Sequence, residues 1–388
     1  MSEWKTTVYM LSDLGEISRG RSRHRPRDDK SLYGGRYPFI QTGDVKAANF
    51  YLSSYSQTYS EAGLAQSKLW KAGTLCITIA ANIAETAILS IDACFPDSIV
   101  GFTPFEGVSD VRYVKYYFDI YKKQMQAMSL GATQDNFSID KMMQVKFIFP
   151  DYPTQNRIAD ILSAYDDAIE NNNRRIALFE KAARELYREW FVRFRFPGYE
   201  GATFVNGLPE GWERAKFKDN ISYITGKLDS NEMVADGRYS FYTCAKIIYK
   251  TDSYCFDGEC VLLGGNNATG DFSLFYANEK LDAYQRTYIV TPLNDRLSCP
   301  YIYFVLENYL QAFKTSSTGA ATKFLTKRML DNFYIILPLK DLSDEYYRIS
   351  KALFDERINL QRQSQNLARQ RDLLLPRLMS GKIKMEDK

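Results

Sequence analysis

Two long stretches of the chain place apolar residues at the spacing of a helix that packs along one stripe. In the stretch 154–194, steps of four and three residues connect Ile158, Leu162, Tyr165, Ile169, Asn172, Ile176, Phe179, Ala183, Leu186 and Trp190. In the stretch 343–379, a seven-residue repeat includes Ile349, Leu353, Leu360, Leu367 and Leu374. Heptad spacing over this length predicts two long coiled-coil helices.

The second helix needs a partner, because its seam also carries Glu356, Gln363 and Gln370. The first helix is the nearest candidate, and a pseudo-twofold relation between the two halves of the chain would make the pair antiparallel. Asn172 in the first seam either fixes the register of the pair or is merely tolerated. A helix of about 35 residues is about 50 Å long, and one turn of DNA is about 34 Å. Such a pair suits a spacer between two domains, although a dimerisation coiled coil shows the same pattern.

The rest of the sequence repeats itself once in the same order. The motif GRYPF at 35–39 returns as GRYSF at 237–241, and a glycine turn leads into a buried strand at 73–77 and at 258–262. The later matches are a strand (98–104 and 287–292), an aromatic helix (111–128 and 300–314), a glycine turn (131–134 and 319–323) and a strand ending in proline (145–150 and 333–338). Each copy then leads into one of the long helices.

This order predicts an α+β protein with a pseudo-twofold internal repeat. We expect two β-rich domains with short helices, at 1–152 and 197–340, joined by two long antiparallel coiled-coil helices within 153–196 and 341–388. The 28 tyrosines and 24 phenylalanines favour β structure, and a hydrophobic content of 45% suffices for packed cores. Duplication alone does not require two binding sites, and it is the long helices that favour two separated heads.

The composition limits the chemistry. With a net charge of only +3, any nucleic-acid site must gather its basic residues locally. The six cysteines form no CxxC pair and only His24 could assist them, so we expect reduced core thiols and no metal site. The sequence shows no signal peptide and no apolar stretch near the ~20 residues of a membrane helix. These features predict a cytoplasmic protein.

Several strings, in order along nearly the whole chain, resemble the specificity subunits of Type I restriction-modification systems. They are residues 131–138 (GATQDNFS) with 155–159 (QNRIA), 188–192 (REWFV) with 194–198 (FRFPG), 208–212 (LPEGW) and 374–383 (LLPRLMSGKI). The second glycine turn departs from the family pattern, because it lacks the Thr-Gln pair of the first.

The resemblance implies a DNA-recognition subunit with no catalytic residues of its own. It implies two target-recognition domains that each read one half of a split DNA sequence. It further implies that the paired helices set the gap between the halves and dock two modification subunits, and that restriction subunits join this core. S-adenosylmethionine, ATP and Mg²⁺ are then implied for the partner subunits, and no cofactor for this chain.

The sharpest DNA-binding candidate is a basic segment that contains Arg19, Arg21, Arg23, Arg25, Arg27 and Lys30. Its glycine and proline predict a loop rather than a helix. An arginine that bonds guanine through two hydrogen bonds is the commonest specific contact, and the alternative is a solvated loop that touches phosphates alone. The matching point of the second copy carries Lys227 and is far less basic, which predicts that the two domains read different sequences. For His24 we expect a phosphate neighbour or no role.

Further candidates lie in polar loops of the two copies. In the first copy they are Gln41, Thr42, Asp44, Asn82, Thr133 and Gln134, and in the second they are Thr243, Lys246, Asn266, Asn267, Thr322 and Lys323. Asn can bond adenine through two hydrogen bonds, although Gly-Asn runs more often form plain turns. The tyrosines that recur in the two aromatic helices are interpreted as core.

No catalytic motif is found in the sequence. It lacks the Pro-Pro of an adenine-methylation loop, and Gly265 and Gly270 are followed by Asp271 instead of the lysine of a P-loop. Carboxylates such as Asp166 and Asp167 are interpreted as helical surface charges. Two other hypotheses remain. One is a coiled-coil interaction protein with β-rich ends, which leaves the arginine loop unexplained, and the other is an enzyme with an unrecognised site.

Overall fold

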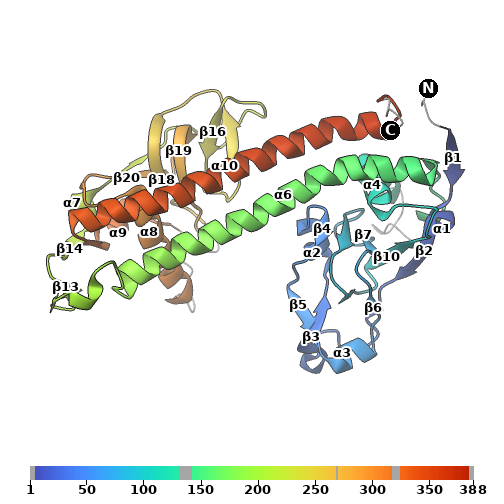
Figure 1. Cartoon of the computed structure of the whole chain (residues 1–388), viewed down its shortest axis with the longest axis horizontal. Coiled ribbons are helices and arrows are strands. Elements are labelled where there is room, and N and C mark those ends of the chain that lie inside the picture. The colour runs from blue at the N-terminus through green and yellow to red at the C-terminus, as the bar shows by residue number, and fades with distance from the viewer. Residues whose placement is uncertain (1–4, 131–141, 268–269, 317–323, 384–388) are drawn as a thin grey trace. The chain divides into compact units, whose positions relative to one another are not determined.

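The chain forms two compact units, shown in Figure 1. The structure is a computed structural model that describes residues 5–130, 142–267, 270–316 and 324–383. Unit 1 comprises Met1–Asn172 and Arg362–Lys388, and unit 2 comprises Asn173–Gln361. The two long helices, α6 (Tyr152–Tyr187) and α10 (Lys340–Met379), each contribute one segment to both units. Each helix therefore belongs in part to both units and is not the separate segment predicted from the sequence. The predicted division into two domains and two separate helical segments differs from this.

The main sheet of unit 1 packs against helices. Its strands lie in the order β2 (Gly15–Arg19), β10 (Ile99–Pro104), β7 (Leu75–Thr78), β8 (Thr86–Leu89) and β4 (Tyr51–Leu52). Leu75 and Val100 of the sheet share one buried cluster with Tyr113 and Phe118 of α4 (Val111–Leu130). The aromatic helix of the first copy is therefore core, as predicted.

Smaller elements complete unit 1. The strand β1 (Thr6–Tyr9) pairs antiparallel with β11 (Phe147–Pro150), which precedes the first long helix. A second sheet has the order β5 (Gln57–Tyr59), β3 (Tyr33–Phe39), β9 (Ala93–Cys94) and β6 (Leu69–Trp70). The connections contain α1 (Leu11–Leu14), the 3₁₀ turn Lys30–Leu32, α2 (Thr42–Ala47) and α3 (Glu61–Ala65).

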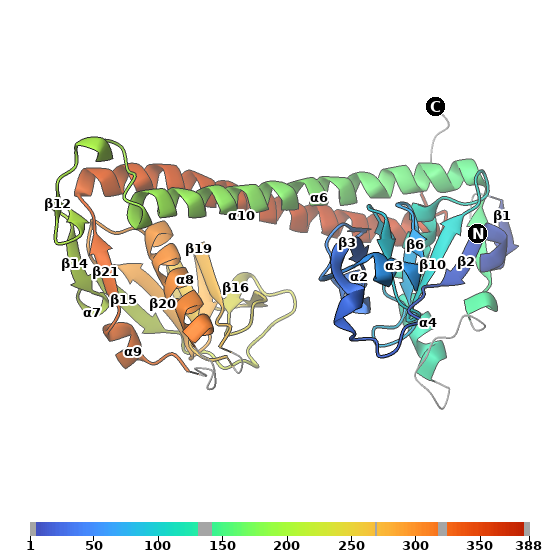
Figure 2. The same cartoon turned by 90° about the horizontal axis from the view of Figure 1, so that it is seen from below.

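Unit 2 follows the same plan. The strand β14 (Glu213–Lys216) pairs antiparallel with β21 (Tyr334–Leu337). The main sheet has the order β15 (Ile221–Thr225), β20 (Thr287–Pro292), β18 (Phe256–Gly264), β19 (Leu274–Ala283), β16 (Tyr239–Tyr242) and β17 (Tyr249–Thr251). Helix α8 (Cys299–Ser316) lies along this sheet (Figure 2) and adds Tyr301 and Phe304 to its core. The remaining elements are the 3₁₀ turn Tyr199–Gly201, β12 (Phe204–Val205), β13 (Leu208–Pro209), α7 (Phe217–Asn220) and α9 (Lys327–Asp331).

The strand pairing confirms the internal repeat. The order β2-β10-β7-β8 in unit 1 matches the order β15-β20-β18-β19 in unit 2. Phe39 pairs in parallel with Cys94, and Phe241 pairs in parallel with Asp282. The copies differ at this point. The path that the single strand β19 follows in unit 2 is divided in unit 1 into two separate strands, β8 and β9.

The repeated GRY motif has a steric cause. A Cβ atom on Gly35 would lie 2.5 Å from the Cα atom of Ser60, and one on Gly237 would lie 2.6 Å from the backbone nitrogen of Thr251. In both units the backbone of a following segment passes too close for any side chain. Glycine at this position is therefore required by the packing of the fold.

Helix α6 begins at a side-chain cap and ends at a buried aromatic pair. The Asp151 carboxylate accepts a hydrogen bond from the Thr154 backbone amide at 3.1 Å, which satisfies one of the free amides of the first turn. After Tyr187 the chain continues as a wider π turn, Arg188–Val192, whose Trp190 and Phe191 are buried in the core of unit 2. The predicted helical segment to residue 196 is wrong at its end, because Phe194 takes a left-handed φ of 55°.

Helix α10 is 40 residues long and carries Pro376 in its last turns. The chain leaves the helix after Met379, and Gly381 takes a positive φ of 70° beyond it. The end of the predicted segment 341–388 is therefore not helical over residues 380–383, and residues 384–388 lie outside the described part.

The two long helices run antiparallel within each unit, as predicted. In unit 1, Arg371 of α10 is ion-paired with Asp166 of α6, and Leu378 shares a buried cluster with Ile158. In unit 2, Arg175 of α6 lies 2.9 Å from Glu356 of α10. In the same unit, Trp190 and Phe191 contact Tyr346 with ring centroids 5.8 and 4.8 Å apart. Later residues of α6 thus face earlier residues of α10.

The residues of the predicted seam differ in burial. Those that are buried are Ile158, Leu162, Ile169, Asn172 and Leu360, and those that are half-buried are Tyr165, Ile176, Phe179, Leu186, Ile349, Leu353, Leu367 and Leu374. In unit 2, α10 also buries a second line of residues, Tyr346, Ser350 and Phe354. This line was missed because a heptad describes packing against one helix, whereas α10 also packs against the core of unit 2.

Asp166 is not a surface charge, which corrects the sequence interpretation. Its side chain is only 2% exposed and is ion-paired with Arg371. The hydroxyl of Tyr116 donates a hydrogen bond to the Asp166 carboxylate at 2.5 Å. This carboxylate therefore joins α4, α6 and α10 inside unit 1, while its neighbour Asp167 is exposed.

Candidate nucleic-acid interface

The arginine-rich segment of unit 1 is a loop with a fixed main chain. It begins at the end of β2, where the Gly20 amide donates to the Ile99 carbonyl at 2.9 Å. The Arg21 amide donates to the Phe95 carbonyl at 3.0 Å. The Arg23 amide then donates to the Gln66 side-chain oxygen at 2.6 Å. A main chain held at this many points presents its side chains from a rigid base.

Two of the predicted DNA-contacting arginines are engaged within unit 1, one with the loop itself and one with a distant carboxylate. One guanidinium nitrogen of Arg25 donates to the carbonyl oxygens of Ser22 and His24 at 2.7 and 2.8 Å. Arg27 donates to both carboxylate oxygens of Asp97 at 3.0 and 2.9 Å. These contacts assign Arg25 and Arg27 a part in shaping the loop. Neither Asp97 nor Gln66 was singled out in the sequence, because nothing local marks a partner at such a distance along the chain.

The other basic side chains of the segment point into solvent. Arg19, Arg21, Arg23 and Lys30 are exposed, and within the described ranges none of these four side chains has a hydrogen-bond or ion-pair partner. The His24 ring lies 3.0 Å from Asp29, which occupies one of its nitrogens. The loop therefore offers several guanidinium groups to a partner while its own structure depends on others.

The remaining candidates of unit 1 are largely engaged in local structure. The Gln41 backbone amide donates to the Asp44 carboxylate at 2.8 Å, so Asp44 takes part in the N-terminal cap of α2. The Gln41 side chain donates to Gln57 at 3.0 Å. Lys46, which the sequence analysis did not select, donates to the Asn82 side-chain oxygen at 3.3 Å. Thr42 is half-buried, and Thr133 and Gln134 lie outside the described residues.

In unit 2 the candidates divide in the same way. Thr243 is buried and its hydroxyl oxygen accepts from the Ala245 amide at 3.1 Å. Lys246 is ion-paired with Asp271, and the Asn267 side-chain oxygen accepts from the Asp271 amide at 3.1 Å.

Two further candidates of unit 2 are described. Asn266 forms an isolated β-bridge with Phe324. Lys227 is exposed and has no side-chain partner among the described residues. Thr322 and Lys323 lie outside the described residues.

The two units place their loops by the same device. In unit 1 a Cβ on Gly20 would lie 2.3 Å from the Phe95 carbonyl oxygen, and in unit 2 a Cβ on Gly226 would lie 1.8 Å from the Ala283 carbonyl oxygen. Each glycine follows the first strand of its main sheet and lets the chain pass tightly over a neighbouring turn. The loops that follow differ in charge, because residues 227–238 contain Asp229, Glu232 and Asp236 against Lys227 and Arg238.

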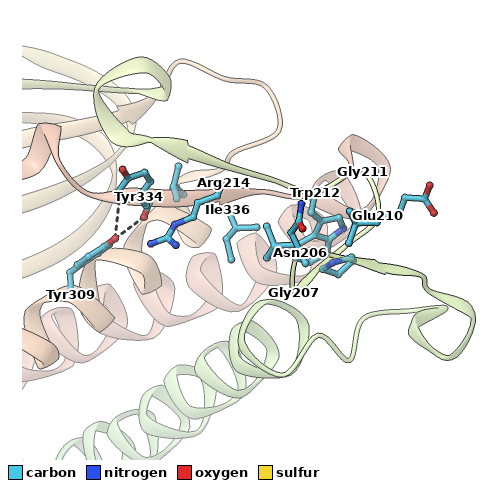
Figure 3. Close-up of a pocket in the computed structure, with 13 residues that line it drawn as sticks. Asn206, Gly207, Glu210, Gly211, Trp212, Arg214, Tyr309, Tyr334 and Ile336 are labelled. Atoms are coloured by element: carbon cyan, nitrogen blue, oxygen red, sulfur yellow. Dashed lines mark hydrogen bonds between the residues drawn. The ribbon is translucent and has the colours of Figure 1, made fainter.

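A large cavity in unit 2 carries no evident chemistry. It has a volume of about 930 Å³ and is lined by Val205, Asn206, Gly207, Leu208, Pro209, Glu210, Gly211, Trp212, Arg214, Tyr309, Tyr334, Ile335 and Ile336. The Arg214 guanidinium lies 4.5 Å from the centre of the Tyr334 ring, and Tyr309 and Tyr334 are joined by hydrogen bonds (Figure 3). The one lining carboxylate, Glu210, lies apart from Arg214 (Figure 3). The lining offers no paired acid and base.

The described residues also bear on metals, thiols and membranes. Within them, no group of three His, Cys, Asp or Glu side chains is placed to hold a metal ion. The six cysteines are free. Four of them, Cys76, Cys94, Cys260 and Cys299, are buried as expected, whereas Cys244 is half-buried and Cys255 is exposed, so the expectation of core thiols is wrong for these two. In the part of the chain that the structure covers, no helix combines the length and apolarity needed to cross a bilayer.

Comparison with known proteins identifies the family. The family model for the Type I restriction modification DNA specificity domain matches residues 1–181 and 209–369. The chain is 25% identical to the Type I restriction enzyme MjaIX specificity subunit of Methanocaldococcus jannaschii, over 98% of this chain and 94% of that protein. It is 22% identical to the HindI specificity subunit of Haemophilus influenzae, over 99% of this chain and 100% of that protein.

A solved structure shows the same fold. The crystal structure of the Type I restriction-modification S subunit from M. genitalium superposes with a TM-score of 0.66 at 15% identity, and covers 99% of this chain and 98% of that one. The family match spans well over half of the sequence and includes both units. The chain therefore belongs to the Type I restriction-modification specificity subunits, a family of non-catalytic subunits that recognise DNA.

Proposed function

We propose that each unit binds one half of a split DNA sequence. The observation that carries this proposal is the pair of equivalent, glycine-anchored loops, at Gly20 and Gly226, on two main sheets of matching strand order. The two loops are placed alike but differ in side chains and charge. Equivalent placement supports the same task in both units, and different chemistry supports different target bases.

In unit 1 the contacts are assigned to the exposed arginines of the loop. Arg21 and Arg23 project from a main chain fixed by Phe95 and Gln66. We propose that at least one of these two arginines hydrogen-bonds the edge of a guanine base. A bidentate arginine–guanine pair is worth about 1–3 kcal/mol of discrimination against a wrong base. Arg19 and Lys30 are assigned to phosphates, which position the protein without reading sequence.

The long helices are proposed to set the gap between the half-sites. Helix α6 has 36 residues and α10 has 40, and each is continuous from one unit into the other. A helix of this length extends about 54–60 Å at ~1.5 Å per residue, which exceeds the ~34 Å of one DNA turn. The same helices are proposed to dock two modification subunits, with restriction subunits joining the complex. S-adenosylmethionine, ATP and Mg²⁺ would be bound by those partners.

The test uses the chain assembled with its modification subunits. The double variant Arg21→Ala/Arg23→Ala should relax the sequence preference of one half-site and leave the other unchanged, as measured by mapping methylated adenines on DNA. The control is Arg36→Ala, which removes another exposed arginine of unit 1, one that is paired with Glu61. Equal loss at both half-sites in the double variant would contradict the assignment.

A further inference from the structure

The turn between β19 and β20 is the point in unit 2 where three separate loops meet. The Arg286 carbonyl oxygen accepts from the Gly265 amide at 2.7 Å and from the Cys244 thiol at 3.4 Å. The Gly226 amide donates to the Thr287 carbonyl at 3.2 Å. Loops 225–227, 243–246 and 264–267, each selected from the sequence as a DNA-reading candidate, therefore all donate hydrogen bonds to the main-chain carbonyls of Arg286 and Thr287.

Hydrogen bonds align this turn with its counterpart in unit 1. The Ile79 amide donates to the Ser98 carbonyl at 3.0 Å, as Gly265 does to Arg286. The Gly20 amide donates to the Ile99 carbonyl at 2.9 Å, as Gly226 does to Thr287. Arg286 thus occupies the position of Ser98.

By the same alignment, Gln285 occupies the position of Asp97. In unit 1 that position holds Arg27 of the basic loop in place. The turn therefore lies directly beside the segment assigned to DNA recognition in unit 1. Its counterpart in unit 2 carries an amide and a guanidinium instead of a carboxylate and a hydroxyl.

The charge of unit 2 also points to this turn. The loop after Gly226 has more acidic than basic residues, and Lys246 is ion-paired with Asp271. Arg286 and Gln285 are exposed, and the Arg286 guanidinium has no hydrogen-bond or ion-pair partner within the described ranges. Among the described residues of these loops and this turn, Arg286 and Lys227 are therefore the cations without an ion-pair partner.

We propose that Arg286 is a specificity-determining residue of unit 2 and bonds the edge of a guanine base in duplex DNA. The proposal rests on the function proposed above. The main chain of Arg286 is fixed at its carbonyl, so the Arg286 guanidinium projects from a rigid turn. The planar fork of this guanidinium matches the two acceptors of guanine in the major groove. Lys227 contacts a neighbouring phosphate and Gln285 lies beside the same base pair.

The experiment maps methylated adenines produced by the complex of the full chain with its modification subunits. With Arg286→Ala, discrimination at one base pair of one half-site should fall by about 5- to 150-fold, while the other half-site keeps its sequence. Arg286→Lys keeps the charge but not the bidentate fork, so it should fail to restore the lost preference. The control Lys218→Ala removes an exposed cation from α7, at the opposite end of β15, and should leave the motif unchanged.

The outcomes separate this proposal from the one that it rests on. A uniform loss of methylation at all sequences, or full rescue by Arg286→Lys, would show a phosphate contact and overturn the base-reading role. An unchanged motif in Arg286→Ala would overturn it as well. If the unaltered complex shows no split motif at all, the proposed function fails instead.

Discussion

The buried ion pair in unit 1 gives a quantitative test of how the long helices are held together. Asp166 is 2% exposed and Arg371 is 21% exposed, and Tyr116 donates a further hydrogen bond to the same carboxylate at 2.5 Å. Among the described residues, the variant Arg371→Ala leaves the buried carboxylate with Tyr116 as its remaining hydrogen-bond partner. Breaking a buried pair in this way costs about 3–5 kcal/mol, and the partial exposure of Arg371 favours the lower end, about 3 kcal/mol.

The same two helices provide the matched control. Arg175 and Glu356 form a pair of 2.9 Å between α6 and α10 in unit 2, but their side chains are 45% and 39% exposed. Exposed pairs contribute little because water screens both charges, so Arg175→Ala should cost less than about 1 kcal/mol. Hydrogen exchange of peptides from α10 measures the free energy of local opening in each variant. Equal losses in the two variants would refute the assignment of Asp166 to a buried structural pair.

The pH dependence of the loss follows from the same site. Burial raises the pKa of Asp166 above its ordinary value, and the hydrogen bond from Tyr116 and the charge of Arg371 oppose that rise. Removing Arg371 should therefore raise the folded-state pKa further above the unfolded value of about 3.9. Because the folded state then holds its proton more tightly than the unfolded state, stability falls as pH rises through this range. The deficit of Arg371→Ala should widen as pH rises above about 4, and a deficit that is constant with pH would contradict this account.

Three further predictions concern the loops and the gap. Gly226→Ala should impair one half-site, because its Cβ would lie 1.8 Å from the Ala283 carbonyl oxygen, whereas Gly201→Ala meets no atom within 4 Å and should leave the methylation motif unchanged. Asp97→Ala should release Arg27 and weaken binding at the other half-site in a gel-shift titration, and unchanged affinity would show that the pair does not shape the loop. Removing one heptad from each long helix should shorten the gap between half-sites or abolish assembly, and an unchanged gap would mean that the helices are not the spacer.

The large-scale plan of the fold could be predicted from the sequence because the heptad spacing and the internal repeat are both visible as periodic patterns of residues. The heptads give the long helices, and the repeated GRY motif marks a place where the backbone of another segment excludes any side chain at Gly35 and Gly237. The two matching glycine turns, 131–134 and 319–323, lie outside the described residues, so the roles predicted for them remain predictions.

The details of the interface depend on contacts between distant residues, and sequence spacing does not encode these contacts. Arg27 could not be separated from Arg21 by sequence alone, because its partner Asp97 comes from another turn of the unit. Asp166 has the spacing of a surface residue, but inside unit 1 it contacts Tyr116 of α4 and Arg371 of α10. Arg286 escaped notice because its counterpart in the first copy is Ser98, and hydrogen bonds rather than residue identity align the two.

The central claim is that the two units read separate halves of one DNA site. The most direct measurement is a genome-wide map of methylated adenines made by the assembled complex, compared between the unaltered chain and the variants Arg21→Ala/Arg23→Ala and Arg286→Ala. The account predicts a split motif with a fixed non-specific gap, one half of which is relaxed by the first variant and the other half by the second. A continuous motif, or variants that relax the same half, would contradict it.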